Sequence, residues 1–150
     1  MNIALTGATG FIGTHLMHGL LGAGHQVRVL VRPGRAGALV KPAGHEIEMH
    51  EGDLTRPESL HGFLAGCELL VHVASAHDHL GEAEMRSVNI QGTEALVNEA
   101  KATGNRDFRL WIVSSAVIGA PVYSYYRDSK RVQEKIVRGS GLPWASFRPT

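Results

Sequence analysis

The sequence predicts an α/β protein with a doubly wound parallel sheet and helices on both faces. Three observations lead to this prediction. Strand-like and helical segments alternate along the chain, several strand-like runs are continuously apolar, and a glycine-rich turn directly follows the first of them. Alternating strands and helices are typical of βαβ crossovers. Continuously apolar strands are typical of a parallel sheet that is buried on both faces.

Six short segments are predicted as strands because apolar side chains dominate them between turn residues. In chain order they are residues 2–6, 26–31, 46–51, 68–73, 108–114 and 144–147. The regular alternation with helices implies that they join one parallel sheet.

Helices are predicted in the intervals between these strands. Residues 11–21 carry apolar side chains at helical spacing and are followed by two glycines. Thr55 is predicted to cap a second helix, with Pro57 in its first turn and Glu58 as the capping-box carboxylate. Two longer helices are predicted at residues 82–102 and 123–137.

The composition is that of one globular domain. The 150 residues suffice for one packed core and are too few for two ordinary domains. Lys and Arg number 15 against 14 Asp and Glu, so no charge surplus indicates a nucleic-acid partner. The single cysteine, Cys67, excludes an internal disulfide and is expected to be buried. Because no leader pattern or membrane-spanning apolar run is present, we expect a cytoplasmic protein without a membrane partner.

The glycine-rich turn has the residues that a dinucleotide-binding loop requires. Gly7 suits the bend between a strand and a helix, because it lacks a Cβ. Gly10 allows the backbone to approach a pyrophosphate at the helix N-terminus, and Gly13 allows the helix to lie close to the sheet. The spacing is GxxGxxG, with one more residue in the turn than the common GxGxxG. The expected cofactor contacts in this turn are Thr6, Gly7, Thr9, Gly10, Phe11, Ile12 and Gly13.

The end of the second predicted strand indicates which dinucleotide binds. An acidic residue there would hold the adenine ribose 2′-hydroxyl of NAD, whereas an arginine suits the 2′-phosphate of NADP. The chain has Arg32 and Arg35 at this place and no carboxylate before Glu46. Since a guanidinium binds a phosphate through paired donors, NADP is predicted rather than NAD.

A tyrosine and a lysine in the last predicted helix form a candidate catalytic pair. Tyr126 and Lys130 are four residues apart, so they share one face of a helix. The phenol titrates near pH ~10, and a neighbouring ammonium lowers that pKa, which makes the phenol a usable proton donor. Tyr123 and Tyr125 have no lysine at this offset.

These motifs follow one another in an order that resembles a known family. They are the glycine turn, residues 24–32, 51–54, 71–76, 88–93 and 113–116, Tyr126 with Lys130, and Arg148 with Pro149. The chain resembles the extended or atypical short-chain dehydrogenases/reductases of the NAD-dependent epimerase/dehydratase superfamily. It is most similar there to NADPH-dependent ketone and aldehyde reductases related to dihydroflavonol reductase and 3β-hydroxysteroid dehydrogenase. The resemblance implies a Rossmann-like fold and a small carbonyl substrate.

The resemblance also implies catalytic roles for particular residues. Tyr126 would protonate the carbonyl oxygen as a hydride arrives from the nicotinamide, and Lys130 would also hold the nicotinamide ribose. A serine would bind the same oxygen, either Ser115 or, if the loop is counted back from its far end, Ser114. Asn89 would support a proton-relaying water.

Further cofactor contacts are implied by the same resemblance. Asp53 and Leu54 would lie beside the adenine. Ala74, Ser75 and Ala76 would line the nicotinamide side of the crevice. Two other functions stay open, an NAD-dependent nucleotide-sugar epimerase or dehydratase and a non-catalytic NADP-binding sensor. Arg32 argues against the first, and the tyrosine–lysine pair against the second.

Nine histidines raise the question of a metal site, above all His77, Asp78 and His79. No set has the spacing of a known metal site, so no metal is predicted. The histidines are expected to have no specific function, or else His77 and His79 contact the substrate near the mouth of the crevice.

The resemblance covers the whole chain but only the front part of a usual family member. The C-terminal substrate lobe of the family would follow Thr150, so we expect a truncated product or fragment, or a chain whose pocket a partner completes. Relatives often form homodimers through the helices at 82–102 and 123–137, although the charged residues of these segments fit a monomer as well.

Overall fold

The computed structural model describes residues 1–150, except for the side chain of Asp78. Six strands form one sheet in the order β3-β2-β1-β4-β5-β6, and every neighbouring pair is parallel. The strands are β1 (Asn2–Thr6), β2 (Gln26–Val31), β3 (Glu48–Glu51), β4 (Leu69–His72), β5 (Arg109–Val113) and β6 (Trp144–Phe147). Two series of crossovers start from the centre of this sheet, which confirms the predicted doubly wound fold.

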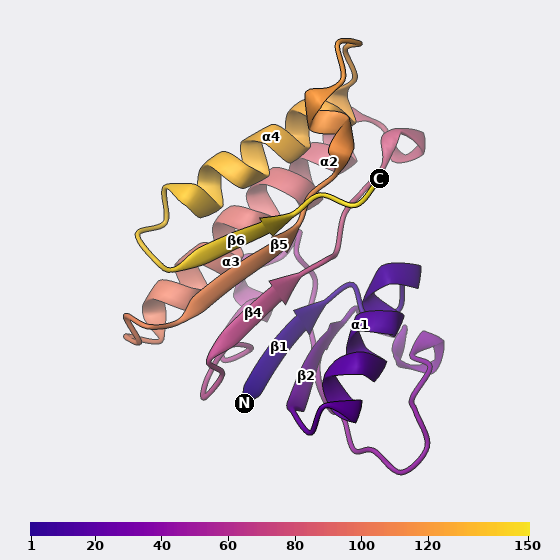
Figure 1. The fold of residues 1–150 in the computed structure, drawn as a ribbon, viewed down its shortest axis with the longest axis vertical. Coiled ribbons are helices and arrows are strands. Elements are labelled where there is room, and N and C mark those ends of the chain that lie inside the picture. The colour runs from indigo at the N-terminus through magenta and orange to yellow at the C-terminus, as the bar shows by residue number, and fades with distance from the viewer.

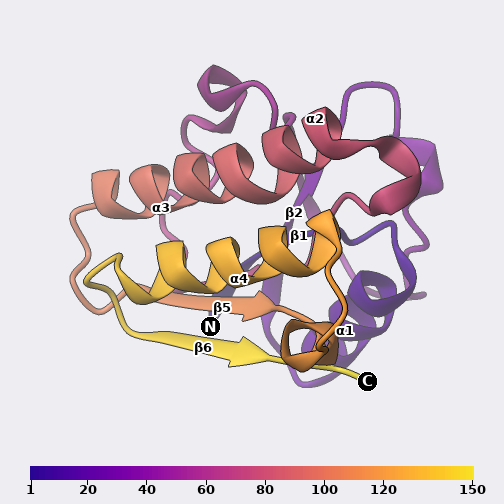
Figure 2. The same cartoon turned by 90° about the horizontal axis from the view of Figure 1, so that it is seen from above.

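Helices cover both faces of the sheet (Figures 1 and 2). Helix α1 (Phe11–Gly22) lies on one face, and α3 (Gly92–Ala102) and α4 (Tyr125–Arg138) lie on the other. The short helix α2 (Glu82–Met85) precedes α3. No helix of the described residues is both long and apolar enough to cross a membrane.

The two faces of the sheet carry separate apolar cores. The core under α1 contains Met17 with side chains of β1 and β2. The core under α3 and α4 contains Leu96, Val137 and the fully buried Phe63 and Phe108. Burying a side chain of this size contributes roughly 1.5–3 kcal/mol, so both helical layers are held to the sheet mainly by apolar burial. Cys67 is buried as predicted, and burial raises the pKa of its thiol.

The predicted strands all occur, and three of them have the predicted bounds. Strand β3 begins two residues later than predicted, and β4 and β5 are each one residue shorter at both ends. Val73 shows a physical reason, because its backbone N–H donates to the hydroxyl of Thr6 at 3.2 Å. The Thr6 side chain therefore accepts the hydrogen bond that a backbone carbonyl of a neighbouring strand would otherwise accept, and β4 ends before Val73.

The predicted helix at 82–102 is interrupted. It consists of α2, a π-helical segment at Arg86–Gln91 and α3. Gly92 follows the π-helical segment, and a Cβ at this position would lie 2.8 Å from Cβ of Leu54. The helix therefore packs closely on the loop after β3. Helix α4 begins at Tyr125 and not at Tyr123, because the Ser124 hydroxyl caps it by accepting from Arg127 N at 3.0 Å.

The predicted helix that starts at Thr55 is wrong. The structure has only a 3-10 turn at Pro57–Leu60, without a side-chain cap. Thr55 instead donates its N–H and its hydroxyl to the Asp53 carboxylate at 2.9 and 2.8 Å. An aspartate that bonds the backbone two residues later favours a turn over a helix, and this competing bond decided the local structure.

Candidate cofactor cavity and catalytic helix

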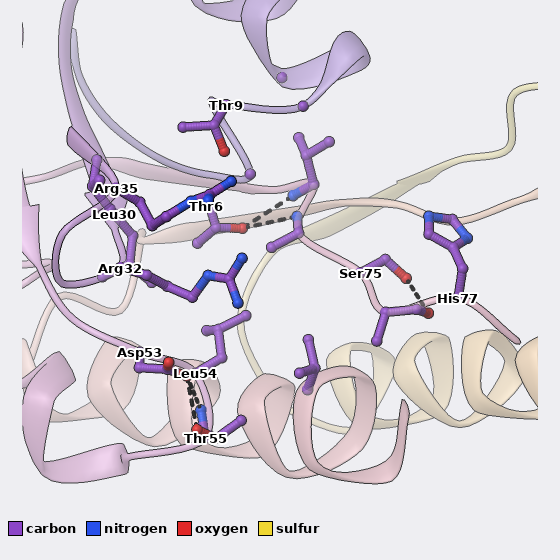
Figure 3. A pocket seen from close by; sticks show the side chains of 18 of the residues that line it. Thr6, Thr9, Leu30, Arg32, Arg35, Asp53, Leu54, Thr55, Ser75 and His77 are labelled. Atoms are coloured by element: carbon purple, nitrogen blue, oxygen red, sulfur yellow. Dashed lines mark hydrogen bonds between the residues drawn. The ribbon is translucent and has the colours of Figure 1, made fainter. Parts of the chain in front are cut away.

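One cavity of about 580 Å³ opens at the carboxyl ends of β1, β2 and β4 (Figure 3). This edge is where open parallel sheets bind ligands. The structure brings to it all of the cofactor contacts predicted outside α4: Thr6, Gly7, Thr9, Gly10, Phe11, Ile12, Gly13, Arg32, Arg35, Asp53, Leu54, Ala74, Ser75 and Ala76. Leu80, Glu84 and Val88 also line the cavity. None of these three was predicted: Glu84 and Val88 come from the interrupted helix, and Leu80 from the 3-10 turn before it.

Two glycines of the turn are required by close backbone contacts. Gly7 has φ 75°, and a Cβ there would lie 2.7 Å from Ala74 N. A Cβ at Gly13 would lie 2.0 Å from the carbonyl oxygen of Gly7. Gly13 thus allows α1 to approach the glycine turn itself, rather than the sheet as predicted. Gly10 is less crowded, since its Cβ would meet only Gly7 O at 3.4 Å.

The N-terminus of α1 is open toward the cavity. Gly10 precedes the helix without a side-chain cap, and the first turn contains no acidic residue. Phe11, Ile12 and Gly13 belong to this first turn and line the cavity. First-turn N–H groups have no partner within their own helix, and the helix dipole favours negative charge there. This end of α1 is therefore suited to bind a phosphate group.

Arg32 and Arg35 extend into the cavity from the end of β2 (Figure 3). Asp53 lies opposite them in the loop after β3. Partial burial opposes ionisation of Asp53, but its pKa is lowered, because Thr55 donates two hydrogen bonds and Arg32 and Arg56 lie near. Asp53 is thus a carboxylate at neutral pH, and Arg32 supplies positive charge beside it within the cavity.

Asn89 fixes the loop that follows β4. Its side chain is fully buried in the π-helical segment. Its Oδ1 accepts from Ala76 N at 2.7 Å and from the Ser75 hydroxyl at 3.2 Å, and its Nδ2 donates to Ala76 O at 2.9 Å. A further bond from Nδ2 reaches Ser129 Oγ in α4 at 3.0 Å. Asn89 therefore joins this wall of the cavity to α4.

None of the residues of the predicted catalytic set belongs to the lining of the cavity. Tyr126 is half-buried in the first turn of α4, and its ring lies 4.9 Å from that of His77, which does line the cavity. Lys130 is buried, and its Nζ donates to Val113 O at the end of β5 at 2.9 Å. Burial lowers the pKa of Lys130 to about 8, while Glu134 opposes this shift. An ammonium with this pKa is still charged at neutral pH.

The two candidate serines differ in their surroundings. Ser114 is buried, its hydroxyl makes no hydrogen bond of good geometry, and it faces the Glu134 carboxylate closely enough to help lower the pKa of that group. Ser115 is half-buried, and its oxygen accepts from Val117 N at 3.3 Å.

The histidine segment contributes ring contacts. His77 and His79 stack with centroids 6.3 Å apart. Among the side chains that the structure describes, no three His, Cys, Asp or Glu residues are grouped so that they could hold a metal ion. The side chain of Asp78, the third member of the candidate set, is outside that description.

Glu134 and Arg148 form a pair that the sequence did not indicate. The buried Glu134 carboxylate accepts from Arg148 Nε at 2.9 Å, from Nη2 at 2.7 Å and from the Ser146 hydroxyl at 2.9 Å. These bonds, those of Arg148 first, lower the pKa of Glu134 to about 2 against burial, which opposes the shift. The pair ties α4 to β6 one helical turn after Lys130.

We expect the Glu134–Arg148 pair to make the fold sensitive to acid. Because the folded pKa lies below the ordinary value of 4.5, the stabilisation is fully present above pH 4.5 and is lost as pH falls toward 2. Glu134→Gln should lower the free energy of unfolding by about 2 kcal/mol at pH 7, with the difference from wild type shrinking between pH 5 and 2. Urea titrations at several pH values measure it. Arg148→Met should show the same pH dependence, and parallel wild-type and Glu134→Gln curves would contradict the assignment.

Comparisons with known proteins agree with this geometry. The family model described as NAD dependent epimerase/dehydratase family matches residues 3–141. A ceramide reductase of Caulobacter vibrioides is 36% identical over 98% of this chain and 45% of its own length. The photosystem II assembly factor Ycf39 of Cyanophora paradoxa is 31% identical over 99% of this chain and 44% of its own length. The enzyme WbmG of Bordetella bronchiseptica, solved in complex with NAD, superposes with a TM-score of 0.81 at 26% identity, covering 99% of this chain and 52% of WbmG. The chain thus spans about half the length of these proteins.

Proposed function

The chain belongs to the NAD-dependent epimerase/dehydratase family, and from this we propose that it binds NADPH in the cavity and reduces a ketone or aldehyde. The observation that carries the proposal is the meeting of three features in one cavity. These are the tight glycine turn, the open N-terminus of α1 and the arginines after β2. A pyrophosphate fits the first two. Titration of the chain with NADPH, followed by assay of carbonyl reduction, tests the proposal.

The preference for NADPH is supported by the charges at the end of β2. Arg32 and Arg35 line the cavity at the end of β2. In proteins that bind NAD, an acidic residue at this place hydrogen-bonds the ribose 2′-hydroxyl. A 2′-phosphate would accept paired hydrogen bonds from a guanidinium there. Asp53 follows β3 and is paired with Thr55, so it does not replace the missing carboxylate of β2.

Arg32→Ala should weaken NADPH binding about tenfold or more and leave NAD binding within about twofold, because one charge-assisted hydrogen bond contributes about 1.5–3 kcal/mol. Equilibrium titrations with both dinucleotides measure the two affinities. Arg56→Ala is the matched control, since Arg56 also lies near Asp53 but does not line the cavity. An unchanged ratio of NADPH to NAD affinity in Arg32→Ala would remove Arg32 from this role.

The proposed chemistry uses the residues beside the cavity. When bound, the reduced nicotinamide supplies the hydride. Tyr126 donates its phenolic proton to the carbonyl oxygen, and the Lys130 ammonium favours the phenolate that remains. Ser115 is the preferred donor to the same oxygen, since it is half-buried while Ser114 is buried and faces Glu134. Asn89 contributes through the loop that it holds, because its side-chain groups already bond Ala76 and Ser129.

The relatives suggest which carbonyl compounds to test first. The similarity to a ceramide reductase supports a long-chain keto lipid as the first candidate. Small aliphatic and aromatic ketones are the comparison set. The chain spans 45% of the length of that relative. That residues 1–150 catalyse the reduction without further residues is therefore a separate part of the proposal, and the same assay tests it.

Two other functions have specific support. The family model and the WbmG complex support tightly held NAD and epimerase-type chemistry. Tenfold tighter binding of NAD than of NADP would favour the epimerase function over the leading proposal. The similarity to an assembly factor supports a non-catalytic dinucleotide-binding role. NADPH binding without reduction of any carbonyl compound would favour that role.

A further inference from the structure

A buried chain of hydrogen bonds runs from the glycine turn to α4, with His72 at its centre. His72 ends β4 and is 3% exposed. Its Nδ1 lies 2.6 Å from the hydroxyl of Thr6, the last residue of β1. Its Nε2 lies 3.1 Å from the hydroxyl of Thr93 in α3, which also accepts from Gln133 Nε2 of α4 at 2.9 Å.

The direction of these bonds determines the form of the imidazole. The Thr93 hydroxyl donates to Asn89 O at 2.7 Å, so its oxygen accepts from His72 and Gln133. Because the Thr6 oxygen already accepts from two backbone N–H groups, its hydroxyl proton is directed to His72 Nδ1, which places the ring proton on Nε2. Gln133 Nε2 also lies 3.3 Å from His72 Nε2, and in this form of the ring that contact joins two N–H groups and is not a hydrogen bond. Its Nδ1 is an acceptor for the Thr6 hydroxyl, as a neutral imidazole permits. Burial, and secondly the Lys130 charge, lower the pKa of His72 to about 3, and Lys130 is the charged group that faces the ring.

Next to the cavity, the Thr6 hydroxyl oxygen also accepts hydrogen bonds from the backbone. It accepts from the backbone N–H groups of Val73 and Ala74 at 3.2 Å each, the two dashed lines at Thr6 in Figure 3. Ala74 N is also the atom that a Cβ at Gly7 would approach to 2.7 Å. The Thr6 hydroxyl thus sets how the glycine turn lies against the Val73–Ala74 wall, and His72 determines where that hydroxyl points.

We propose that His72 is a positioning residue for the dinucleotide cavity: its neutral ring orients the Thr6 hydroxyl, which holds the Val73–Ala74 wall against the glycine turn. This inference rests on the proposed function for its ligand. At the other end of this series of hydrogen bonds, Thr93 and Gln133 anchor the imidazole ring to α3 and α4. Gln133 lies three residues after Lys130 in α4, so the same bonds connect the cavity wall with the helix that carries Tyr126 and Lys130.

Two substitutions separate positioning from simple structural support. His72→Asn places an amide oxygen where Nδ1 was and keeps an acceptor for Thr6, whereas His72→Gln places an amide N–H where Nε2 was and keeps a donor for Thr93. Each loses one buried bond, so both should lower the melting temperature similarly. NADPH affinity should fall about tenfold in His72→Gln and stay within about twofold in His72→Asn. Exchange of the Val73 and Ala74 amide hydrogens should be faster in His72→Gln.

Equal NADPH affinities together with equal amide exchange in the two variants would overturn the role of His72. A wild-type chain that binds no dinucleotide would remove the proposed function alone, and amide exchange would still decide whether His72 positions this wall. Nitrogen-15 NMR of the wild-type ring requires no substitution. We expect a neutral ring protonated on Nε2 from pH 8 down to about 5, and a ring that titrates near its ordinary value of about 6.5 would overturn the inference.

Discussion

Tyr126→Phe should abolish carbonyl reduction and leave the affinity for NADPH nearly unchanged. The substitution removes only the phenolic hydroxyl, and the ring can keep its place beside His77. Loss of a positioned proton donor costs about 10²–10⁴-fold in rate. In the proposed mechanism the buried Lys130 ammonium stabilises the phenolate of Tyr126, and a phenylalanine has no hydroxyl that could form one. The decrease in NADPH absorbance measures turnover, and a fluorescence titration measures affinity.

Tyr125→Phe is the matched control for this prediction. Tyr125 is the neighbouring residue of α4, is also half-buried and has no lysine at the same offset. We expect its rate to remain within about twofold of wild type, since a peripheral hydroxyl contributes little. Wild-type turnover by Tyr126→Phe would exclude the tyrosine as the proton donor. A similar loss in both variants would point to a change in α4 instead.

Gly13→Ala should eliminate measurable NADPH binding. Its Cβ would lie 2.0 Å from the carbonyl oxygen of Gly7 and 3.0 Å from Cα of Ala8, both backbone atoms that cannot move alone. Helix α1 must therefore shift away from the glycine turn, and its N-terminus shifts with it. Since the pyrophosphate is expected to bind at that N-terminus, we predict a loss of more than about 100-fold in affinity and a lower melting temperature.

Two alanine substitutions in the same segment complete this experiment. Gly19→Ala is the control, because nothing lies within 4 Å of its Cβ. It should bind NADPH normally and gain about 0.5–1 kcal/mol in stability from helix propensity. Gly10→Ala has room in the folded protein, yet the residue lines the cavity, so it should weaken NADPH binding without unfolding. Normal affinity in Gly13→Ala and Gly10→Ala would show that the dinucleotide does not bind at this turn.

Several features of this protein are set by residues that are neighbours in the sequence. The glycine turn and Arg32 could be read from short segments because neighbouring residues impose their geometry. Parallel strands could be found because burial on both faces leaves an apolar run. The helix expected at Thr55 failed where a single side chain, Asp53, competes for the backbone donors. The π-helical segment carries no sequence signal of its own, since close packing of Gly92 on Leu54 accompanies it.

The doubly wound fold and the glycine turn and arginines that line the cavity could be predicted from the amino-acid sequence. Periodicity and glycine geometry are properties of adjacent residues, and a parallel sheet then brings the strand ends to one edge. Which buried polar groups meet depends on how the elements pack against one another. His72 with Thr6 and Thr93, and Glu134 with Arg148, join residues from different elements. Their protonation follows from burial and from partners far along the chain, and neither is visible in a short segment.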